Sequence, residues 1–310
     1  MTPDLRPSTF CCSVTPFASD GSLDEEALRA HLHRLADAGV GVYVAGSSPG
    51  EGYALSRDEL RRCLEIAVRE IGDRVPVRAM GVEPRSASQM VDFVRLAADA
   101  GVHAVQLYSL DLGHGGRPGA ETLERYFRTA IEAAPIPCVV SSHHFGGYVL
   151  EPELVASLAH DYEHLIGFNV TSPEIPYLVR VLDAVDGRAA VHVGGPMHAL
   201  TALALGAQGF LSSESNYAPR TAQRVIERWV AGDHPAVFSA WAVLVRLMTG
   251  MGDVPGMSVR TVKAMLGALG YAGTGLRGPH LPLSDEERAR AGKRLASLGI
   301  RELEARLAQA

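Results

Sequence analysis

The strongest constraint on the fold is an alternation of short β-branched runs with longer amphipathic stretches, repeated along the first 220 residues. This alternation is typical of strand-helix units arranged around a parallel sheet. The strands are expected at residues 11–15, 41–45, 76–80, 104–108, 137–141, 165–169, 190–193 and 209–212. Eight strands favour a closed barrel over an open sheet. The expected fold class is therefore α/β, a (β/α)8 TIM barrel.

Serine motifs predict where several helices begin. Ser22, Ser56 and Ser86 are each followed three residues later by Glu or Gln, the spacing at which two side chains satisfy orphan amides reciprocally. Ser172 followed by Pro173 predicts a further helix start. The amides of the first helical turn have no intrahelical partner, so the N–H that proline lacks is not missed there.

Glycines predict where two helices end. The tripeptide Ala-Gly-Val recurs around Gly39 and Gly101, where a helix C-cap glycine is expected to precede the next strand. The recurrence at the same point of two units indicates repeated supersecondary structure.

No strand is expected after residue 220. Helices are expected over residues 221–231, 234–248, 258–269 and 284–308. Two regions are therefore expected: residues 1–220 form the barrel, and residues 221–310 form its last helix and a C-terminal helical extension.

Composition excludes several classes of protein. A net charge of −6 without a basic cluster argues against nucleic-acid binding. No uncharged window approaches the ~20 apolar residues of a membrane span, and no signal peptide is recognised. Cys11, Cys12, Cys63 and Cys138 lie in apolar runs without metal-type spacing, so reduced core thiols and a cytoplasmic location are expected.

Lysine is scarce, and this limits the chemistry. Lys263 and Lys293 are the only lysines, and both lie beyond the expected strands. Barrels of this kind often condense a lysine amine with a substrate carbonyl. Here no expected strand end carries such an amine.

Four short motifs occur in order: Val-Thr-Pro-Phe from Val14, Gly-Ser-Ser-Pro-Gly-Glu from Gly46, Val-Lys-Ala-Met-Leu from Val262 and Leu-Pro-Leu-Ser from Leu281. Together they resemble the dihydrodipicolinate synthase and N-acetylneuraminate lyase family of pyruvate-handling aldolases, over residues 12–298. The resemblance implies a (β/α)8 barrel with a C-terminal helical extension, usually assembled as a homotetramer from two dimers.

The resemblance also implies a site from which this chain departs. Family members attach a 2-oxo acid to a lysine on the sixth strand, where this chain has Asn169. The tyrosine that ends strand five and shuttles protons corresponds to Ser141. The following arginine segment is replaced by residues 143–147, His-His-Phe-Gly-Gly, so a role in lysine biosynthesis is not expected.

The family's carboxylate-binding loop corresponds to Ser47 and Ser48, with Pro49 inserted. Gly195 belongs to the pair at the end of strand seven where backbone approaches substrate, and glycine allows close contact. Glu51 matches a glutamate that braces the loop. Lys263, in the helical tail, is interpreted as structural.

Barrel enzymes place their chemistry at the carboxyl ends of the strands. Asn169 cannot form an imine, but it can donate a hydrogen bond to a carbonyl or enolate oxygen. His143 or His144 can serve as general acid or base, and strand alternation favours His143 because it shares a side with Ser141. Glu214 can orient a histidine or act as a base. The competing interpretations are a core amide, a loop histidine pair that faces solvent or a subunit contact, and a solvated glutamate.

A divalent metal is a further alternative. His114, His143, His144, His192 and Glu214 are the possible ligands, although His192 can also point outward to the helices. None of them has diagnostic ligand spacing, so no metal and no cofactor are expected.

Two hypotheses follow. The first is a lyase of the dihydrodipicolinate synthase type that acts on a small carboxylated carbonyl compound without a lysine Schiff base, by aldol cleavage, dehydration or cyclisation. The second is a catalytically silent relative that binds a metabolite or a partner. A homo-oligomer, dimer or tetramer, is expected in both cases.

Overall fold

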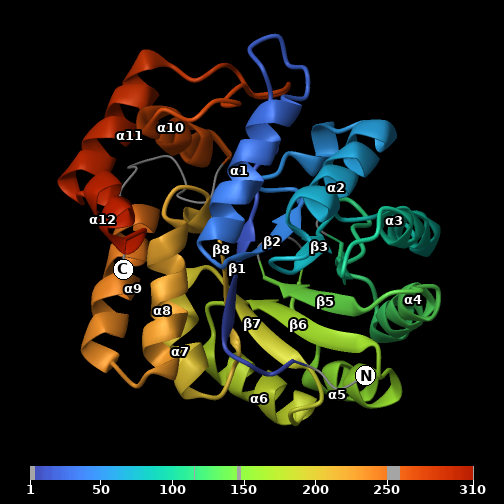
Figure 1. Cartoon of the computed structure of the whole chain (residues 1–310). Coiled ribbons are helices and arrows are strands. Elements are labelled where there is room, and N and C mark those ends of the chain that lie inside the picture. The colour runs from blue at the N-terminus through green and yellow to red at the C-terminus, as the bar shows by residue number, and fades with distance from the viewer. Residues whose placement is uncertain (1–3, 115, 145–147, 250–258, 310) are drawn as a thin grey trace. The chain divides into compact units, whose positions relative to one another are not determined.

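The strands form a closed parallel barrel in which sequence order equals spatial order, β1 through β8. The computed structural model describes residues 4–114, 116–144, 148–249 and 259–309. Helices follow the strands along the chain, and further helices come after β8, as the colours of Figure 1 show. The expected (β/α)8 fold with a C-terminal helical extension is confirmed.

The strands lie close to their expected positions. Their bounds are β1 Ser8–Cys12, β2 Gly41–Val44, β3 Val77–Ala79, β4 Ala104–Leu107, β5 Cys138–His143, β6 Leu165–Thr171, β7 Ala190–Gly194 and β8 Gly209–Ser212. Strand β1 begins three residues earlier than expected. Strands β5 and β6 each run two residues further, because they stay paired as far as His143 and Thr171. The extra residues place His143 on a strand instead of in a loop.

The barrel helices are α1 Glu25–Asp37, α2 Arg57–Ile71, α3 Ala87–Asp99, α4 Ala120–Glu132, α5 Pro152–Asp161, α6 Ile175–Val185, α7 Ala199–Ala204 and α8 Pro219–Val230. The extension contains α9 His234–Thr249, α10 Val259–Leu269, α11 Asp285–Ser297 and α12 Ile300–Leu307. The helix expected over 258–269 corresponds to α10, and its expected first residue, Ser258, lies outside the residues that the structure describes.

Two of the four predicted helix starts are confirmed. Ser56 forms a complete capping box, and the Ser86 hydroxyl accepts from the third amide of its helix. The other two are wrong. Asp24 caps α1, since Ser22 is held in a turn by Asp20. The Ser172 hydroxyl accepts from the Glu174 amide in the loop, and α6 begins only at Ile175.

Glycines with positive φ end several helices. Gly39 (φ 73°) and Gly101 (φ 79°) follow α1 and α3 as predicted, since only glycine adopts this region without strain. Gly299 (φ 58°) separates α11 from α12. The prediction of one helix over 284–308 is therefore wrong.

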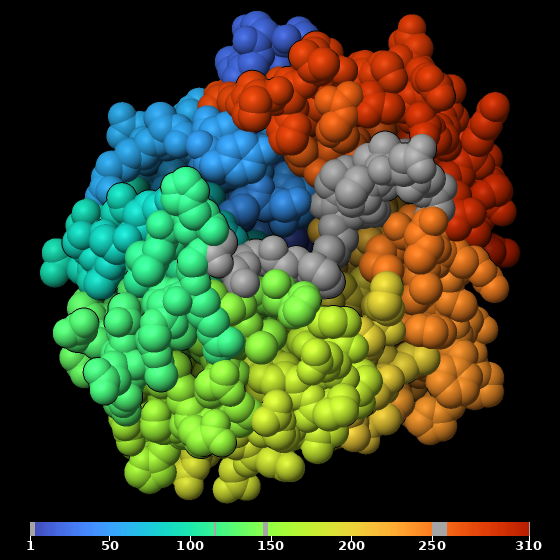
Figure 2. Space-filling model, turned by 180° about the vertical axis from the view of Figure 1, so that it is seen from behind, coloured from blue at the N-terminus to red at the C-terminus, as the bar shows by residue number. Residues whose placement is uncertain are grey.

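The chain divides into two compact units, residues 1–7 with 78–211 and residues 8–77 with 212–310. In the second unit, segments from opposite ends of the chain meet. Phe17 exchanges backbone hydrogen bonds with Gly273 and Gly275, and the blue and red surfaces adjoin near the top of Figure 2. Helix α8 packs beside α9 in the same unit (Figure 1).

All four cysteines are free, as predicted, and only Cys12 is not fully buried. Among the described residues, the search for a helix long and apolar enough to cross a membrane finds none.

Candidate functional site

The direction of the β5 side chains follows from Ser142. Its hydroxyl is 2.6 Å from the hydroxyl of Tyr177 on α6 and accepts from the Leu150 amide at 2.9 Å. Ser142 therefore faces the helices. Because side chains alternate along a strand, Ser141 and His143 face the barrel interior.

Strand register extends this interior face to β6. Ser141 pairs with Asn169 and His143 pairs with Thr171, and residues paired in a parallel ladder share a face. Asn169 is 5% exposed. Asn169 therefore lies on the same side as Ser141 and His143, two residues before the end of β6, whereas the strand was expected to end at Asn169.

The interior face continues to β7, where His192 pairs with Asn169. The interpretation that His192 points outward is therefore wrong. Burial lowers the pKa of His192 to about 3, and the positive charge of Arg78 adds to this effect. His192 is consequently a neutral interior side chain at pH 7.

Gln106 holds Asn169. The Asn169 Nδ2 donates to Gln106 Oε1 at 2.5 Å, and both side chains are buried. Sequence reasoning missed Gln106, although it is the one polar residue of the Ala-Val-Gln-Leu strand β4. A polar residue within such an apolar strand indicates a buried hydrogen-bonding role, and this pattern could have identified Gln106.

His143 is half-buried, whereas His144 is exposed. Burial lowers the pKa of His143, and the charge of neighbouring His144 lowers it further. The His144 amide donates to the Thr171 carbonyl at 2.8 Å, which continues the hydrogen bonding of β5 to β6 by one residue. His143 is thus a neutral imidazole at pH 7, the form that accepts a proton.

In the second unit, Glu214 opens a short 3₁₀ helix, Glu214–Asn216, and is completely buried. Ser212 Oγ donates to its Oε2 at 2.9 Å, and Oε1 has no hydrogen-bond partner among the described residues. Burial raises the pKa of Glu214 to about 7. The alternative of a solvated surface glutamate is therefore wrong, and the protonated and ionised forms are both accessible near neutral pH.

Asn216 anchors the turn that carries Glu214. Its Oδ1 accepts from the Val14 amide at 2.9 Å, and its Nδ2 donates to the carbonyls of Cys12 and Ser213 at 2.7 and 2.9 Å. These three bonds fix the end of β1 and the start of the short helix to each other. Sequence reasoning did not select Asn216, because two of its partners, Cys12 and Val14, are about 200 residues away.

The loop after β2 is closed on itself. Gly52 N donates to Gly46 O at 2.9 Å, and Thr15 Oγ1 donates to Gly50 O at 2.6 Å. Within this loop Ser47 is half-buried and Ser48 is exposed. Two hydrogen bonds to carbonyls of this loop therefore hold the backbone that carries Ser47 and Ser48.

Glu51 ends this loop and is completely buried against Lys263 of α10, which also donates to Gly275 O at 2.6 Å. The other oxygen of Glu51 accepts from the Arg277 amide at 3.2 Å. Both contacts agree with the interpretation of Glu51 and Lys263 as structural residues.

Gly195 follows β7 with φ 80°, and its amide donates to Leu211 O at 2.7 Å. No heavy atom lies within 4 Å of the position that a Cβ would occupy there. Glycine is required by the backbone angle, and the space beside it is open.

The predicted site residues thus fall into two sets. Ser141, His143 and Asn169 share the interior face of one unit with Gln106, while Ser47, Ser48 and Glu214 belong to the other unit. No group of three or more His, Cys, Asp or Glu side chains that could hold a metal ion is found among residues 4–114, 116–144, 148–249 and 259–309.

Comparison with known proteins gives relatives over almost the whole chain. A 4-hydroxy-tetrahydrodipicolinate synthase from Methanothrix thermoacetophila is 31% identical over 284 residues, which cover 91% of this chain and 93% of the relative. A DapA-like lyase from Halobacterium salinarum is 31% identical over 296 residues, covering 93% of this chain and 92% of the relative.

Solved structures share the fold. YagE from E. coli K12, a dihydrodipicolinic acid synthase family protein solved with pyruvate, superposes with a TM-score of 0.87 at 24% identity, covering 96% of this chain and 100% of that chain. A dihydrodipicolinate synthase from Thermotoga maritima gives 0.87 at 22% identity, with coverage of 96% and 100%. The model of the dihydrodipicolinate synthetase family matches residues 8–298, so the chain belongs to this family.

Proposed function

We propose that this protein is a lyase that acts on a small carboxylated carbonyl compound without forming a lysine Schiff base. The observation that carries the proposal is the interior face on which Asn169, held by Gln106, lies beside the strand that bears Ser141 and His143. An amide on this face polarises a carbonyl oxygen through a hydrogen bond, and a neutral imidazole accepts a proton.

The proposed step is a proton-coupled cleavage or elimination. In an aldol cleavage, His143 removes the β-hydroxyl proton, the bond between the α- and β-carbons breaks to leave a carbonyl at the β-carbon, and the electron pair moves onto the carbonyl oxygen as an enolate. The Asn169 amide stabilises that oxygen. The imidazolium of His143 then returns the proton to the α-carbon. A dehydration uses the same groups in another order: His143 removes the α-proton, the enolate forms, and the imidazolium of His143 gives the proton to the departing hydroxyl group, which leaves as water.

The substrates of this chemistry are limited by the strength of the electron sink. A neutral hydrogen-bond donor stabilises an enolate less than a protonated imine does, since the imine carries a full positive charge. We therefore propose substrates whose α-proton or leaving group is already activated, for instance by a second carbonyl or carboxylate group.

A catalytically silent binding protein is the second candidate. It is favoured by the bond between Asn169 and Gln106, which is also what a satisfied core amide makes. In this case the small carboxylate binds and is released unchanged.

Substitution of His143 separates the two candidates. We screen a panel of 2-oxo and 3-hydroxy acids for turnover by NMR, then compare wild type with His143→Gln and with His160→Gln, an exposed helix histidine. The lyase predicts a rate reduced about 10²- to 10⁴-fold by His143→Gln alone, with substrate binding retained. Turnover that is unchanged by His143→Gln refutes the assigned role, and binding without turnover by wild type supports the silent protein.

We also propose that the protein is a cytoplasmic homo-oligomer, a dimer or a tetramer. The four free cysteines support a reducing compartment. Light scattering coupled to size-exclusion chromatography gives the mass of the assembly directly.

A further inference from the structure

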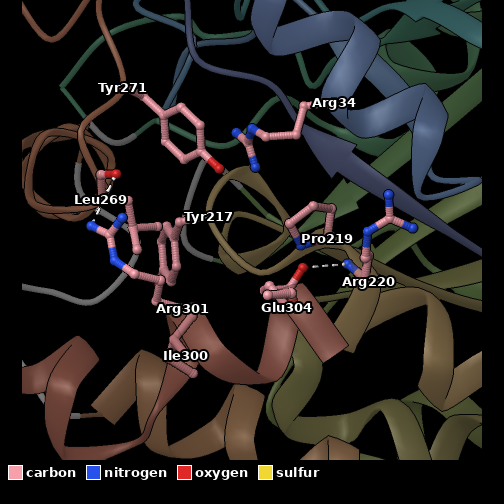
Figure 3. A pocket seen from close by; sticks show the side chains of 10 residues that line it. Arg34, Tyr217, Pro219, Arg220, Leu269, Tyr271, Ile300, Arg301 and Glu304 are labelled. Atoms are coloured by element: carbon pink, nitrogen blue, oxygen red, sulfur yellow. Dashed lines mark hydrogen bonds between the residues drawn. The ribbon is translucent and has the colours of Figure 1, made fainter. Parts of the chain in front are cut away.

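A pocket lies between α1, α8, α10 and α12, all in the second unit, apart from the residues assigned above. It has a volume of about 240 Å³, and three arginines, Arg34, Arg220 and Arg301, line it together with Glu304. Figure 3 shows Arg34 and Tyr271 pointing toward each other across one side of the pocket.

The charges of this pocket are unbalanced. None of the three arginines makes a salt bridge with a carboxylate among the described residues. Among the described residues, the guanidinium groups of Arg220 and Arg301 donate to main-chain carbonyls, those of Asp37 and of the last residues of α10. The pocket thus presents guanidinium groups without a matching anion.

Glu304, the one acidic residue of the pocket, is already used. Its oxygens accept from the Arg220 amide, the Thr221 amide and the Thr221 hydroxyl at 2.9, 2.9 and 2.5 Å. Glu304 therefore caps the first turn of α8, and its charge acts on Arg34 without a hydrogen bond or salt bridge to any of the three guanidinium groups among the described residues.

Arg34 carries the strongest indication of a missing anion. One of its terminal nitrogens donates to Asn216 O and lies 2.8 Å from His31 Nδ1, while its Nε is buried without a partner among the described residues. Its guanidinium lies 4.3 Å from the centre of the Tyr271 ring. Burial lowers the pKa of Arg34, which means that its positive charge is poorly stabilised as it stands.

The other walls are apolar. Tyr217, Pro219, Leu269 and Ile300 line the pocket beside the arginines (Figure 3). Pockets for drug-sized ligands have volumes of about 300–1,000 Å³, so this one suits a smaller molecule. A planar guanidinium matches a carboxylate through two parallel hydrogen bonds.

We propose that this pocket binds a small organic anion, with one carboxylate at Arg34 and Arg301 and a compact apolar body against Tyr217 and Leu269. The pocket touches the turn that carries Glu214, because Arg34 donates to the carbonyl of Asn216 and Tyr217 follows Asn216 in the chain. Binding of an anion at Arg34 should therefore change the environment of Asn216.

Titration calorimetry with benzoate as the probe tests the site, with benzamide as its uncharged counterpart. We expect benzoate to bind and benzamide to bind about tenfold or more weaker, because only the carboxylate pairs with the guanidinium groups. Arg34→Met and Arg301→Met should each weaken benzoate binding about tenfold, whereas Arg69→Met, an exposed arginine of α2, leaves it unchanged. Arg34→Lys keeps the positive charge but not the planar pair of donors, and should weaken benzoate binding less than Arg34→Met.

NMR locates the bound probe. Benzoate should shift the side-chain amide resonances of Asn216 in wild type, and the shift should be lost in Arg301→Met. Because Arg301→Met leaves Arg34 in place, it tests the site even if Arg34→Met does not fold. Equal affinities for benzoate and benzamide overturn the proposal, and so does benzoate binding that survives Arg301→Met. Binding of inorganic phosphate without binding of benzoate overturns the organic carboxylate as occupant.

Discussion

Lys263 and Glu51 form a completely buried ion pair that joins α10 to the loop after β2. The Lys263 Nζ also donates to the Gly275 carbonyl and lies 4.4 Å from the centre of the Phe17 ring. One of the two lysines of this chain is thus engaged in structure. The other, Lys293, is exposed on α11.

Removal of one partner of this pair should destabilise the protein strongly. Lys263→Met leaves the Glu51 carboxylate buried without its cation, which costs about 3–5 kcal/mol. Denaturant unfolding of wild type and variant measures the loss. Lys293→Met is the matched control and should change stability by less than about 0.5 kcal/mol. The double variant Lys263→Met/Glu51→Gln should be more stable than Lys263→Met, and the opposite order would show that the pair is not coupled.

Pyruvate with borohydride should leave the mass of this protein unchanged. No lysine lies on any strand, Lys263 is held by Glu51, and Lys293 is exposed on α11, so we expect no imine at the carboxyl ends of the strands. Intact-protein mass spectrometry checks this, with a family member that carries the sixth-strand lysine as the positive control. A reduced adduct on Lys263 or Lys293 would falsify the proposed chemistry.

Glu214 should make stability depend on pH near neutrality. Its pKa rises from 4.5 to about 7 on folding, so the folded state binds more protons than the unfolded state between these values. Its contribution to stability is therefore lost as pH increases from about 4.5 to 7. Glu214→Gln should be more stable relative to wild type at pH 8 than at pH 5, by about 3 kcal/mol.

Urea unfolding at the two pH values measures this difference. Glu227→Gln, an exposed glutamate of α8, serves as the control and should show no such difference. A Glu214→Gln variant whose stability relative to wild type is the same at pH 5 and pH 8 would show that the carboxyl is ionised normally in the folded protein.

His144 should influence the titration of His143. Burial is the larger cause of the lowered His143 pKa, and the charge of His144 is the second. His144→Asn removes the second cause, so the pKa of His143 should rise toward 6.5 without reaching it. NMR titration of the imidazole resonances measures this directly. The same titration in His160→Asn should leave His143 unchanged, and an unchanged value in His144→Asn would contradict the assigned coupling.

Gln106 should contribute to the stability of the protein through its hydrogen bond with Asn169. Gln106→Leu leaves the Asn169 amide without the acceptor that it now contacts, at a cost of about 1–3 kcal/mol. The double variant Gln106→Leu/Asn169→Leu should recover part of the loss, since no buried amide remains. Thermal unfolding compares the three proteins. If the double variant loses the sum of the single losses, the two amides do not act as a pair.

Much of the barrel was predictable because its signals are local. Alternating strand and helix patterns, Ser56, Ser86, Gly39 and Gly101 act within one turn or one strand, and their effects appear where expected. The wrong helix starts have a local cause too, since Ser22 and Ser172 each prefer a competing turn.

The site was less predictable, because its properties depend on distant neighbours. The sequence by itself determined that Asn169 lies on the sixth strand and that no strand carries a lysine. Only the tertiary structure decided that Gln106 holds Asn169, that His192 faces inward and that Glu214 is buried. Hydrogen-bond partners and desolvation come from residues far apart in the chain, and these set the orientation of a side chain and its pKa.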